Sequence, residues 1–204
     1  MSNRAKELPI PHFLCQPEDM ADIRDNLEGP AVRPALIEDA AAIAAIYAEH
    51  VRRGTASFDT VARTIPDTEA KIAEITANGW PFLVAEKHGE ILGYAYANQF
   101  RDRAAYSFAC ENSIYVRADC VGQGVGVVLL RALVDAATQR GFRQMIAVIG
   151  GGEPASVALH AKLGFAHAGR MRSVGRKFER WLDTVYMQLE LGEGDAVPPG
   201  YEPA

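Results

Sequence analysis

Three glycines at alternate positions, Gly122, Gly124 and Gly126, give the strongest chemical signal in the sequence. They follow a short apolar stretch at 113–117 and precede a long segment with helical spacing, so they form a loop between a strand and a helix. Glycine lets the backbone turn tightly and approach a ligand without a clash from Cβ. A helix start offers unpaired N–H groups and a positive dipole end. The loop is therefore predicted to bind a pyrophosphate.

Two other nucleotide-binding loops do not fit this pattern. A Walker P-loop requires Lys and then Ser or Thr after its last glycine, whereas Gly126 is followed by Val127 and Val128. A dinucleotide fingerprint lies in the first strand–helix unit of its fold, but at least three predicted strands precede this loop. A tight strand–helix turn without a ligand is the alternative for the loop taken alone.

The predicted elements around the loop alternate between strands and helices. Their limits come from apolar spacing and from turn residues such as Gly89 and Gly141. Strands are predicted over residues 31–36, 82–85, 91–100, 113–117, 143–149 and 182–191. Helices are predicted after Asp39, which is expected to cap the first of them, and over 66–78, 124–140 and 155–163. This order indicates a mixed α/β domain.

Length and composition bound the class of protein. The 204 residues correspond to one ordinary domain, and 49% hydrophobic residues suffice for a core. The net charge of −5 argues against a nucleic-acid partner, because neutralising phosphates requires a basic face. The sequence has no apolar run of ~18 residues and no secretory signal, so we expect a cytoplasmic protein that does not enter a membrane.

The chain divides into three predicted parts. Residues 1–30 form an N-terminal extension of unknown role, with one possible short helix over 19–27, and 31–191 form the domain. Residues 192–204, with several glycines and prolines, are expected to be a flexible tail. The cysteines lack metal-ligand spacing, which predicts free thiols and no metal site: Cys15, Cys110 and Cys120.

The glycine loop resembles the pyrophosphate loop of the GNAT acetyltransferases, which reads Gln/Arg-x-x-Gly-x-Gly/Ala. Gly124 and Gly126 match, whereas Val121 replaces the leading Gln or Arg and removes a side chain but no backbone donor. The turn at 163–165 also resembles the family's turn after its fourth helix. The resemblance implies the GNAT fold, a mixed and mainly antiparallel sheet flanked by helices, with acetyl-CoA as co-substrate.

The GNAT resemblance also assigns cofactor contacts. It gives the pantetheine arm to the backbone of Ile114, Tyr115 and Val116. It gives the pyrophosphate to a longer run: Val121, Gly122, Gln123, Gly124, Val125, Gly126 and Val127. Glu153 and Ser156 complete the expected cofactor residues; related enzymes often carry asparagine at the first, and glutamate keeps an acceptor but loses the amide donor.

A closer resemblance is to the phosphinothricin and methionine sulfoximine acetyltransferases, a GNAT subfamily. The matching stretches lie at 82–86, 93–97, 100–106, 111–116, 141–145, 156–160 and 181–183. The resemblance implies acetylation of the α-amine of a small amino acid analogue, such as phosphinothricin, methionine sulfoximine or methionine sulfone. It also implies a homodimer.

Acetyl transfer to an amine needs a base for the ammonium proton, donors for the oxyanion and a proton for the leaving thiolate. Glu111 can be that base if burial raises its pKa, or it can be a solvated loop residue. His160 lies mid-helix beside Leu159, where a histidine is more often a core residue than a catalytic one. The subfamily resemblance supports catalytic roles for both Glu111 and His160.

Arg101, Arg103 and Tyr106 directly follow a predicted strand. Arginine can bind a carboxylate with two parallel hydrogen bonds, and a solvated turn is the alternative. The resemblance places this segment in the acceptor pocket, with Arg101 or Arg103 as the carboxylate clamp.

A basic stretch near the C-terminus has aromatic neighbours, Phe178 and Trp181. It can be a solvated face, or it can attract CoA phosphates or an anionic substrate. The resemblance places it where the site closes across a dimer interface. The basic residues are Arg170, Arg172, Arg176, Lys177 and Arg180.

The sequence thus predicts an acetyl-CoA-dependent N-acetyltransferase for a small amino acid. We expect direct attack by the amine, because Cys110 and Cys120 have no evident histidine base beside them for an acetyl-enzyme. Two alternatives stay open: a GNAT enzyme that acetylates a protein N-terminus or a polyamine, and a non-catalytic sensor that binds acyl-CoA.

Overall fold

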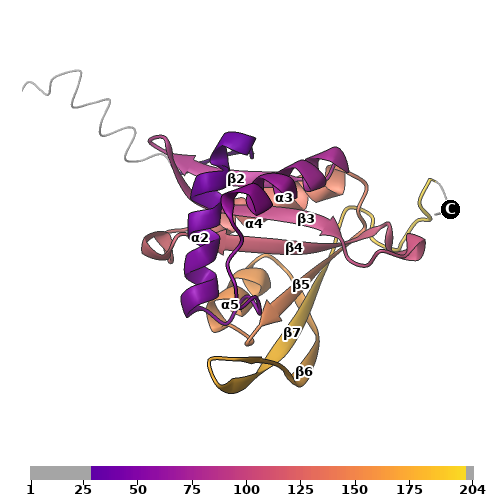
Figure 1. Cartoon of the computed structure of the whole chain (residues 1–204). Coiled ribbons are helices and arrows are strands. Elements are labelled where there is room, and N and C mark those ends of the chain that lie inside the picture. The colour runs from indigo at the N-terminus through magenta and orange to yellow at the C-terminus, as the bar shows by residue number, and fades with distance from the viewer. Residues whose placement is uncertain (1–28, 201–204) are drawn as a thin grey trace, which may run out of the picture.

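One sheet with helices on both faces forms the body of the molecule (Figure 1). The computed structural model describes residues 29–200, so the possible helix over 19–27 lies outside the described residues. No helix in this part of the chain is long and apolar enough to cross a membrane.

The strands and helices fall close to their predicted positions. The strands are β1 Ala31–Pro34, β2 Phe82–Lys87, β3 Glu90–Gln99, β4 Ala109–Val116, β5 Gln144–Gly150, β6 Ala166–Lys177 and β7 Arg180–Glu190. The helices are α2 Ala40–Arg53, α3 Ile65–Ala77, α4 Val125–Gln139 and α5 Pro154–Lys162. Two differences matter: β4 starts at Ala109 rather than Ser113, and β6 was not predicted at all.

The strand order over the described residues is β1-β2-β3-β4-β5-β7-β6. Only β4 and β5 pair in parallel, and the other neighbours are antiparallel. This confirms the predicted mixed, mainly antiparallel sheet. β6 escaped prediction because it is an almost wholly exposed edge strand whose residues do not alternate between apolar and polar.

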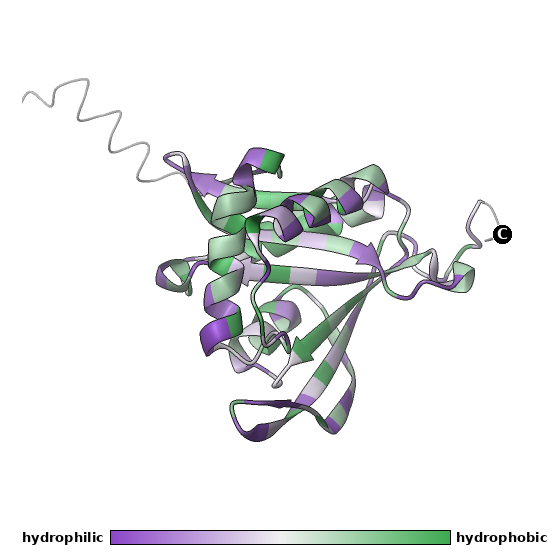
Figure 2. Cartoon of the chain, viewed as in Figure 1, coloured by the Kyte–Doolittle hydropathy of each residue, from purple (hydrophilic) through white to green (hydrophobic). Residues whose placement is uncertain are grey.

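Alternation along β3 fixes what each face of the sheet packs against. Tyr94 and Tyr96 belong to the cluster formed with α2 and α3, whereas Ala95 and Ala97 pack in the cluster that contains Leu129 of α4. The sheet thus presents small residues of β3 to α4 and large aromatic residues of β3 to α2 and α3. Figure 2 shows hydrophobic residues along strands in the middle of the fold, most plainly on β2 and β5.

The expected cap of α2 is wrong. Asp39 has helical backbone angles (φ −76°, ψ −10°) that continue a preceding 3-10 turn, and its side chain makes no capping bond to α2. Its carboxylate instead accepts from the Leu36 N–H and from both terminal nitrogens of Arg33, each at 2.8 Å. The Arg33 guanidinium holds the pKa of Asp39 below its ordinary value.

The sheet opens between β4 and β5. The two strands pair only from Ala109 opposite Gln144 to Asn112 opposite Ala147. Beyond that point β4 continues on β3 as far as Val116, and β5 continues on β7 as far as Gly150. The resulting fork leaves two strand edges facing each other without hydrogen bonds between them, and the candidate site lies there.

Candidate functional site

Main-chain groups of β4 line one side of the fork. The Arg117 N–H donates to Leu92 O and Ala109 O accepts from Phe100 N–H, so odd-numbered residues point their backbone groups at β3. The even-numbered Ile114 and Val116 therefore turn theirs into the fork. Val116 O already accepts a bond of 2.8 Å from His50 Nε2 if that nitrogen carries the proton.

The same alternation corrects one expected contact. Tyr115 lines the fork, but it pairs with Tyr94 of β3, so its backbone is committed to the sheet rather than open to a ligand. The expected backbone contacts of a pantetheine arm are thus available at Ile114 and Val116 and not at Tyr115.

The glycine loop begins α4 at the wide end of the fork. Gly122 and Gly124 have φ of 81° and 86°, a region that favours glycine, although open space surrounds both. Gly126 lies close to α5, where a Cβ would approach Leu159 Cδ2 to 3.1 Å, a tight contact. The Val127 N–H already donates to Gly124 O at 3.0 Å, so the free donors for an anion at the start of α4 are the N–H groups of Val125 and Gly126.

A groove of about 600 Å³ joins the fork to the glycine loop. It is lined by ten of the twelve expected cofactor residues: Ile114, Tyr115, Val116, Val121, Gly122, Gly124, Gly126, Val127, Glu153 and Ser156. The other two do not line it, because Gln123 is exposed with its amide on Asp119 O and Val125 is buried in the core. His50 and Lys162 also line the groove and were not predicted.

A second, more polar pocket of about 290 Å³ lies on the other side of the fork. It shares four lining residues with the groove: Ala56, Ile114, Tyr115 and Ser156. Glu111 and His160, the two predicted catalytic residues, both line it. A molecule in the groove and a molecule in this pocket would meet at the common wall.

Glu111 lies in this pocket from β4, opposite Asn98 of β3. Burial raises the pKa of its carboxyl, and the positive charge of Arg101 partly opposes that rise. A raised pKa is what a carboxylate needs to accept a proton from an ammonium group near neutral pH. Glu111 thus lies in a pocket rather than in a solvated loop, and its role as the base stays a prediction.

His160 enters the pocket from the other face of the sheet and is 2% exposed. Its Nδ1 lies 2.7 Å from Ser156 O, which can only accept, so Nδ1 carries the proton. Its Nε2 lies 2.8 Å from the amide nitrogen of Asn112 and therefore accepts. Burial lowers the pKa of His160, so both ring nitrogens are occupied in a neutral ring.

Arg101, Arg103 and Tyr106 are exposed and do not line the pocket. The Arg101 guanidinium stacks on the Phe100 ring, 4.5 Å from its centroid, and is close enough to Glu111 to affect its pKa. The segment 101–106 therefore lies beside the polar pocket near Glu111, but neither Arg101 nor Arg103 lines that pocket.

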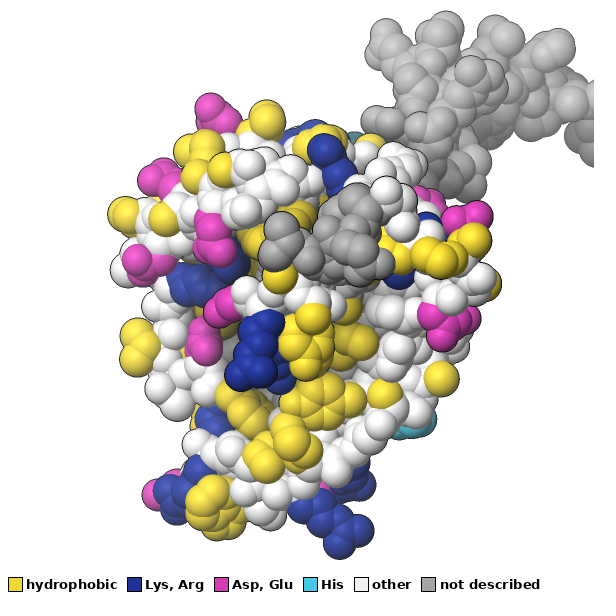
Figure 3. Space-filling model, turned by 90° about the vertical axis from the view of Figure 1, so that its right-hand side faces the viewer, with side chains coloured by type: hydrophobic (Ala, Val, Ile, Leu, Met, Phe, Trp, Pro, Cys, Tyr) yellow, Lys and Arg dark blue, Asp and Glu magenta, His cyan; other side chains and the backbone are white. Residues whose placement is uncertain are grey.

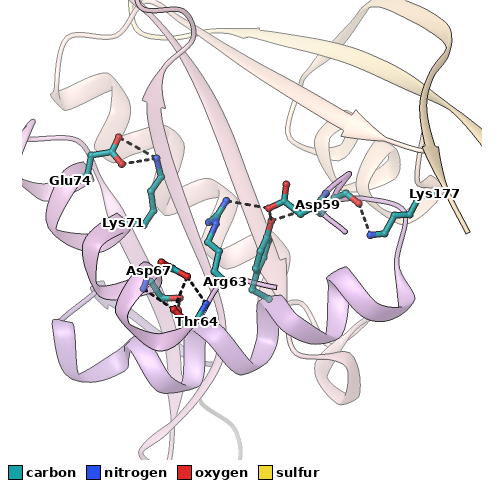
Figure 4. A network of polar contacts seen from close by, with 10 residues as sticks. Asp59, Arg63, Thr64, Asp67, Lys71, Glu74 and Lys177 are labelled. Atoms are coloured by element: carbon teal, nitrogen blue, oxygen red, sulfur yellow. Dashed lines mark hydrogen bonds and ion pairs between the residues drawn. The ribbon is translucent and has the colours of Figure 1, made fainter. Parts of the chain in front are cut away.

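The pocket contains polar residues that sequence reasoning missed, namely Tyr47, Ser57, Asp59 and Arg63. Figure 4 shows Asp59 between Arg63 and the end of β6, where Lys177 lies. The Tyr47 hydroxyl donates a short hydrogen bond to Asp59, and Ser57 Oγ is 3.1 Å from the same hydroxyl. These residues come from α2 and the loop after it, and no local spacing in the sequence marks them.

Lys177 departs from the expected solvated face of the basic stretch. Its side chain is buried, and Nζ donates to Gly54 O at 3.0 Å and to Ser57 O at 2.9 Å. Burial lowers the pKa of Lys177. The lysine therefore fixes the loop that carries Ala56 to Asp59 along both pockets.

The residues described by the structure include no group of three or more His, Cys, Asp or Glu side chains that could hold a metal ion. Cys110 and Cys120 are buried free thiols, and burial raises the pKa of Cys110 to about 12.

Comparison with known proteins connects this geometry to a family. The family model described as an acetyltransferase (GNAT) domain matches residues 32–186. A phosphinothricin N-acetyltransferase of Alcaligenes faecalis is 48% identical over 169 residues, covering 82% of this chain and 86% of that protein. An L-methionine sulfoximine/L-methionine sulfone acetyltransferase of Pseudomonas aeruginosa is 38% identical, covering 82% of this chain and 98% of its own length.

A solved structure shows the same fold. The GNAT superfamily phosphinothricin acetyltransferase from Sinorhizobium meliloti, crystallised in complex with AcCoA, superposes with a TM-score of 0.82. It is 44% identical, and the match covers 84% of this chain and 94% of that one. The forked sheet, the glycine loop and these matches agree, and the chain belongs to the GNAT acetyltransferase family.

Proposed function

We propose that this protein transfers the acetyl group of acetyl-CoA to the α-amine of a small amino acid analogue of the phosphinothricin, methionine sulfoximine or methionine sulfone type. One observation carries the proposal: the cofactor groove and the polar pocket share a wall at Ala56, Ile114, Tyr115 and Ser156, with Glu111 in the polar pocket. The names of the similar enzymes support the acceptor class.

Acetyl-CoA fits the groove by chemistry as well as by likeness. The open strand edge at Ile114 and Val116 can pair with the amides of a pantetheine arm, as an added strand would. The start of α4 suits the pyrophosphate. Lys162 supplies a further nitrogen donor along the groove, whereas the N–H of His50 is bonded to Val116 O.

Glu111 is the proposed base. An amino acid arrives mainly as its ammonium form at neutral pH, and only the free amine attacks a thioester. The Glu111 carboxylate accepts this proton inside the pocket, where burial raises its pKa and so favours its protonated form. When the tetrahedral intermediate collapses, the second proton lost by the attacking nitrogen passes to the departing CoA thiolate. The Ile114 N–H in the fork is the proposed donor to the oxyanion, which leaves the Ile114 carbonyl and the Val116 N–H to pair with the pantetheine arm.

His160 is proposed to act through Asn112 rather than as a direct proton donor to the thiolate. Its proton is committed to Ser156 O, and its other nitrogen accepts from Asn112 where β4 and β5 separate. Holding Asn112 in place keeps the fork open at a defined point. The predicted role as acid would require a second proton on a ring that burial keeps neutral.

A protein N-terminus or a polyamine is the second candidate acceptor, because Asp59 and Glu111 place two carboxylates in the pocket. The pocket's size of about 290 Å³ and the presence of Arg63 favour a small zwitterion instead. The deciding experiment measures release of CoA thiol with three acceptor classes at equal concentration. The proposal expects turnover with free amino acid analogues and little with peptides or spermidine; preferred turnover of either of the latter two would refute it.

We also propose a homodimer that forms through the β6–β7 end of the molecule and acts in the cytoplasm. On the face shown in Figure 3, hydrophobic side chains gather beside Lys and Arg side chains toward this end. Trp181 is 65% exposed and Phe178 is 47% exposed. Sedimentation should show a dimer at micromolar concentration and a monomer for Trp181→Glu. The free thiols of Cys110 and Cys120 support the reducing compartment.

A further inference from the structure

Arg63 is the arginine that lines the polar pocket, and it lies between α2 and α3. Its guanidinium carbon is 4.5 Å from the centroid of the Tyr47 ring, and it interacts with the Tyr96 hydroxyl. The side chain is 32% exposed, so the charge is partly removed from water but still reachable. Figure 4 shows it extending toward Asp59.

The charge of Arg63 is incompletely matched within the protein. Its nearest described carboxylate is Asp59, with Nη2 3.9 Å from Oδ2, which is beyond hydrogen-bond length. That oxygen already accepts from the Tyr47 hydroxyl. The guanidinium therefore keeps donors that no carboxylate of the described chain occupies.

Arg33 in the same protein shows what a fully matched arginine looks like. Its two terminal nitrogens each donate to Asp39 at 2.8 Å, and Nε donates to Glu86 at 2.6 Å. The guanidinium nitrogens of Arg33 are therefore all bonded to carboxylates of this chain, which joins β1 to Glu86 of β2 and to Asp39. Arg63 has the same chemistry but lines a pocket, so its free donors are available to a ligand.

We propose that Arg63 binds a carboxylate or phosphinate oxygen of the acceptor. Arg63 thereby makes the enzyme prefer acceptors that carry such a group over otherwise identical acceptors that lack it. The inference rests on the proposed function, because it assumes that the acceptor amine lies at Glu111 in this pocket. A zwitterionic amino acid then finds a carboxylate for its amine and an arginine for its acid in one cavity. A carboxylate and a phosphinate both offer paired oxygens to a guanidinium. The oxyanion bound by Arg63 is therefore either the α-carboxylate of the acceptor or an acidic group of its side chain, and the experiment must distinguish the two.

The test compares methionine sulfone with its primary amide, because the α-carboxylate is the only anion of that substrate. We expect wild-type kcat/KM to favour the free acid by about 10–100-fold, the usual worth of a charge-assisted pair. In Arg63→Gln this preference should fall to about threefold or less. Arg63→Lys should keep part of it, since the charge remains but the planar fork is lost. Arg52→Gln, on exposed α2 surface, is the matched control and should retain the full preference.

Phosphinothricin separates the two sources. If Arg63→Gln keeps the acid-over-amide preference but loses a preference for phosphinothricin over methionine sulfone, the bound oxyanion is the phosphinate and the proposal stands. Unchanged preferences in Arg63→Gln, with loss in Arg101→Gln or Arg103→Gln, would overturn it and restore the clamp predicted from the sequence. A shift in melting temperature with CoA shows that each variant is folded.

Failure of the proposed function gives a different result. In that case wild type acetylates none of the three amino acid analogues, whatever residue stands at position 63, and the inference falls with it. Failure of the inference alone leaves wild type active and Arg63→Gln equally selective.

Discussion

The cofactor groove and the acceptor pocket differ in how close together in the sequence their defining residues lie. Two neighbouring stretches, the β4 edge and the glycine loop at the start of α4, form one side of the groove, and residues of α2, the loop after it and α5 complete it. The pocket is made by side chains from α2, the loop after it, β3, β4, β5, α5 and β7, spread from Tyr47 to Thr184. The two sites nevertheless share one wall.

This difference in construction explains why substitutions change acceptor specificity more easily than specificity for the acyl donor. Backbone donors depend on conformation, so replacing side chains at the β4 edge or in the glycine loop alters little unless a glycine with positive φ is involved. Side chains in the pocket can each be exchanged without disturbing the strand that holds them. A family can thus keep one acyl donor and vary its acceptor. Of the variants below, Glu111→Gln and Gly124→Val each affect one site, and Lys177→Met affects the wall that the two sites share.

Glu111→Gln should have the largest effect on the reaction rate. The effect should be confined to proton removal in the acceptor pocket and should leave CoA binding unchanged. We expect kcat at pH 7 to fall by roughly 10²–10⁴-fold, the usual worth of a positioned base, with CoA affinity unchanged. The loss should shrink as pH rises, because more acceptor then arrives as the free amine. Stopped-flow or steady-state rates between pH 6 and 9 check this.

Folding stability provides the control for that variant. Burial raises the pKa of Glu111 in the folded state, so its carboxyl destabilises the fold increasingly as pH rises from the unfolded pKa through the folded one. Glu111→Gln should therefore be at least as stable as wild type at pH 7, with the difference vanishing at low pH. A variant that is both inactive and less stable at pH 7 would mean that Glu111 has a structural role.

Gly124→Val should affect the groove and leave the pocket intact. Its φ of 86° is strained for a β-branched residue, so the N–H groups at the start of α4 move from their positions. We expect the Kd for CoA, by calorimetry, to rise by about 10–100-fold. Gly89→Val is the matched control, because Gly89 has φ of 77° in the β2–β3 turn outside the groove. Equal losses of CoA affinity in both variants would show that the backbone of the glycine loop has no specific role in binding CoA.

Lys177→Met should produce the smallest change and should affect the shared wall. The variant leaves the carbonyls of Gly54 and Ser57 without their donor, which costs about 1–3 kcal/mol of unfolding free energy. KM for the acceptor should rise as the loop loosens. Arg176→Met, at the exposed neighbouring position, should change the urea midpoint little. Indistinguishable midpoints for the two variants would show that Lys177 does not hold the loop.

The same contrast accounts for what the sequence could and could not predict. Gly122, Gly124 and Gly126 form a local pattern whose meaning is set by backbone geometry, so the groove was found with ten of its expected residues in place. Arg63 and Asp59 come from a loop between two helices, and only the tertiary fold brings them to Glu111. β6 was missed because an exposed edge strand needs no apolar alternation, and Lys177 was misplaced with it.

Sequence reasoning also gave His160 a role that its surroundings do not favour. The helical position beside Leu159 predicted correctly that the side chain points inward, and it is 2% exposed. What the spacing could not show was that Ser156 O and Asn112 occupy both ring nitrogens, since Asn112 comes from a distant strand.

The central claim is that amine and thioester meet directly at the common wall of the two sites. Initial rates measured over a grid of acetyl-CoA and acceptor concentrations test it. We predict intersecting double-reciprocal lines and no acetylated protein by intact mass after incubation with acetyl-CoA alone. The Cys110 thiol is buried with its pKa raised to about 12, and the Cys120 thiol lies on the Asp119 carboxylate. Parallel lines together with a covalently acetylated protein that passes its acetyl group to the acceptor would contradict the account.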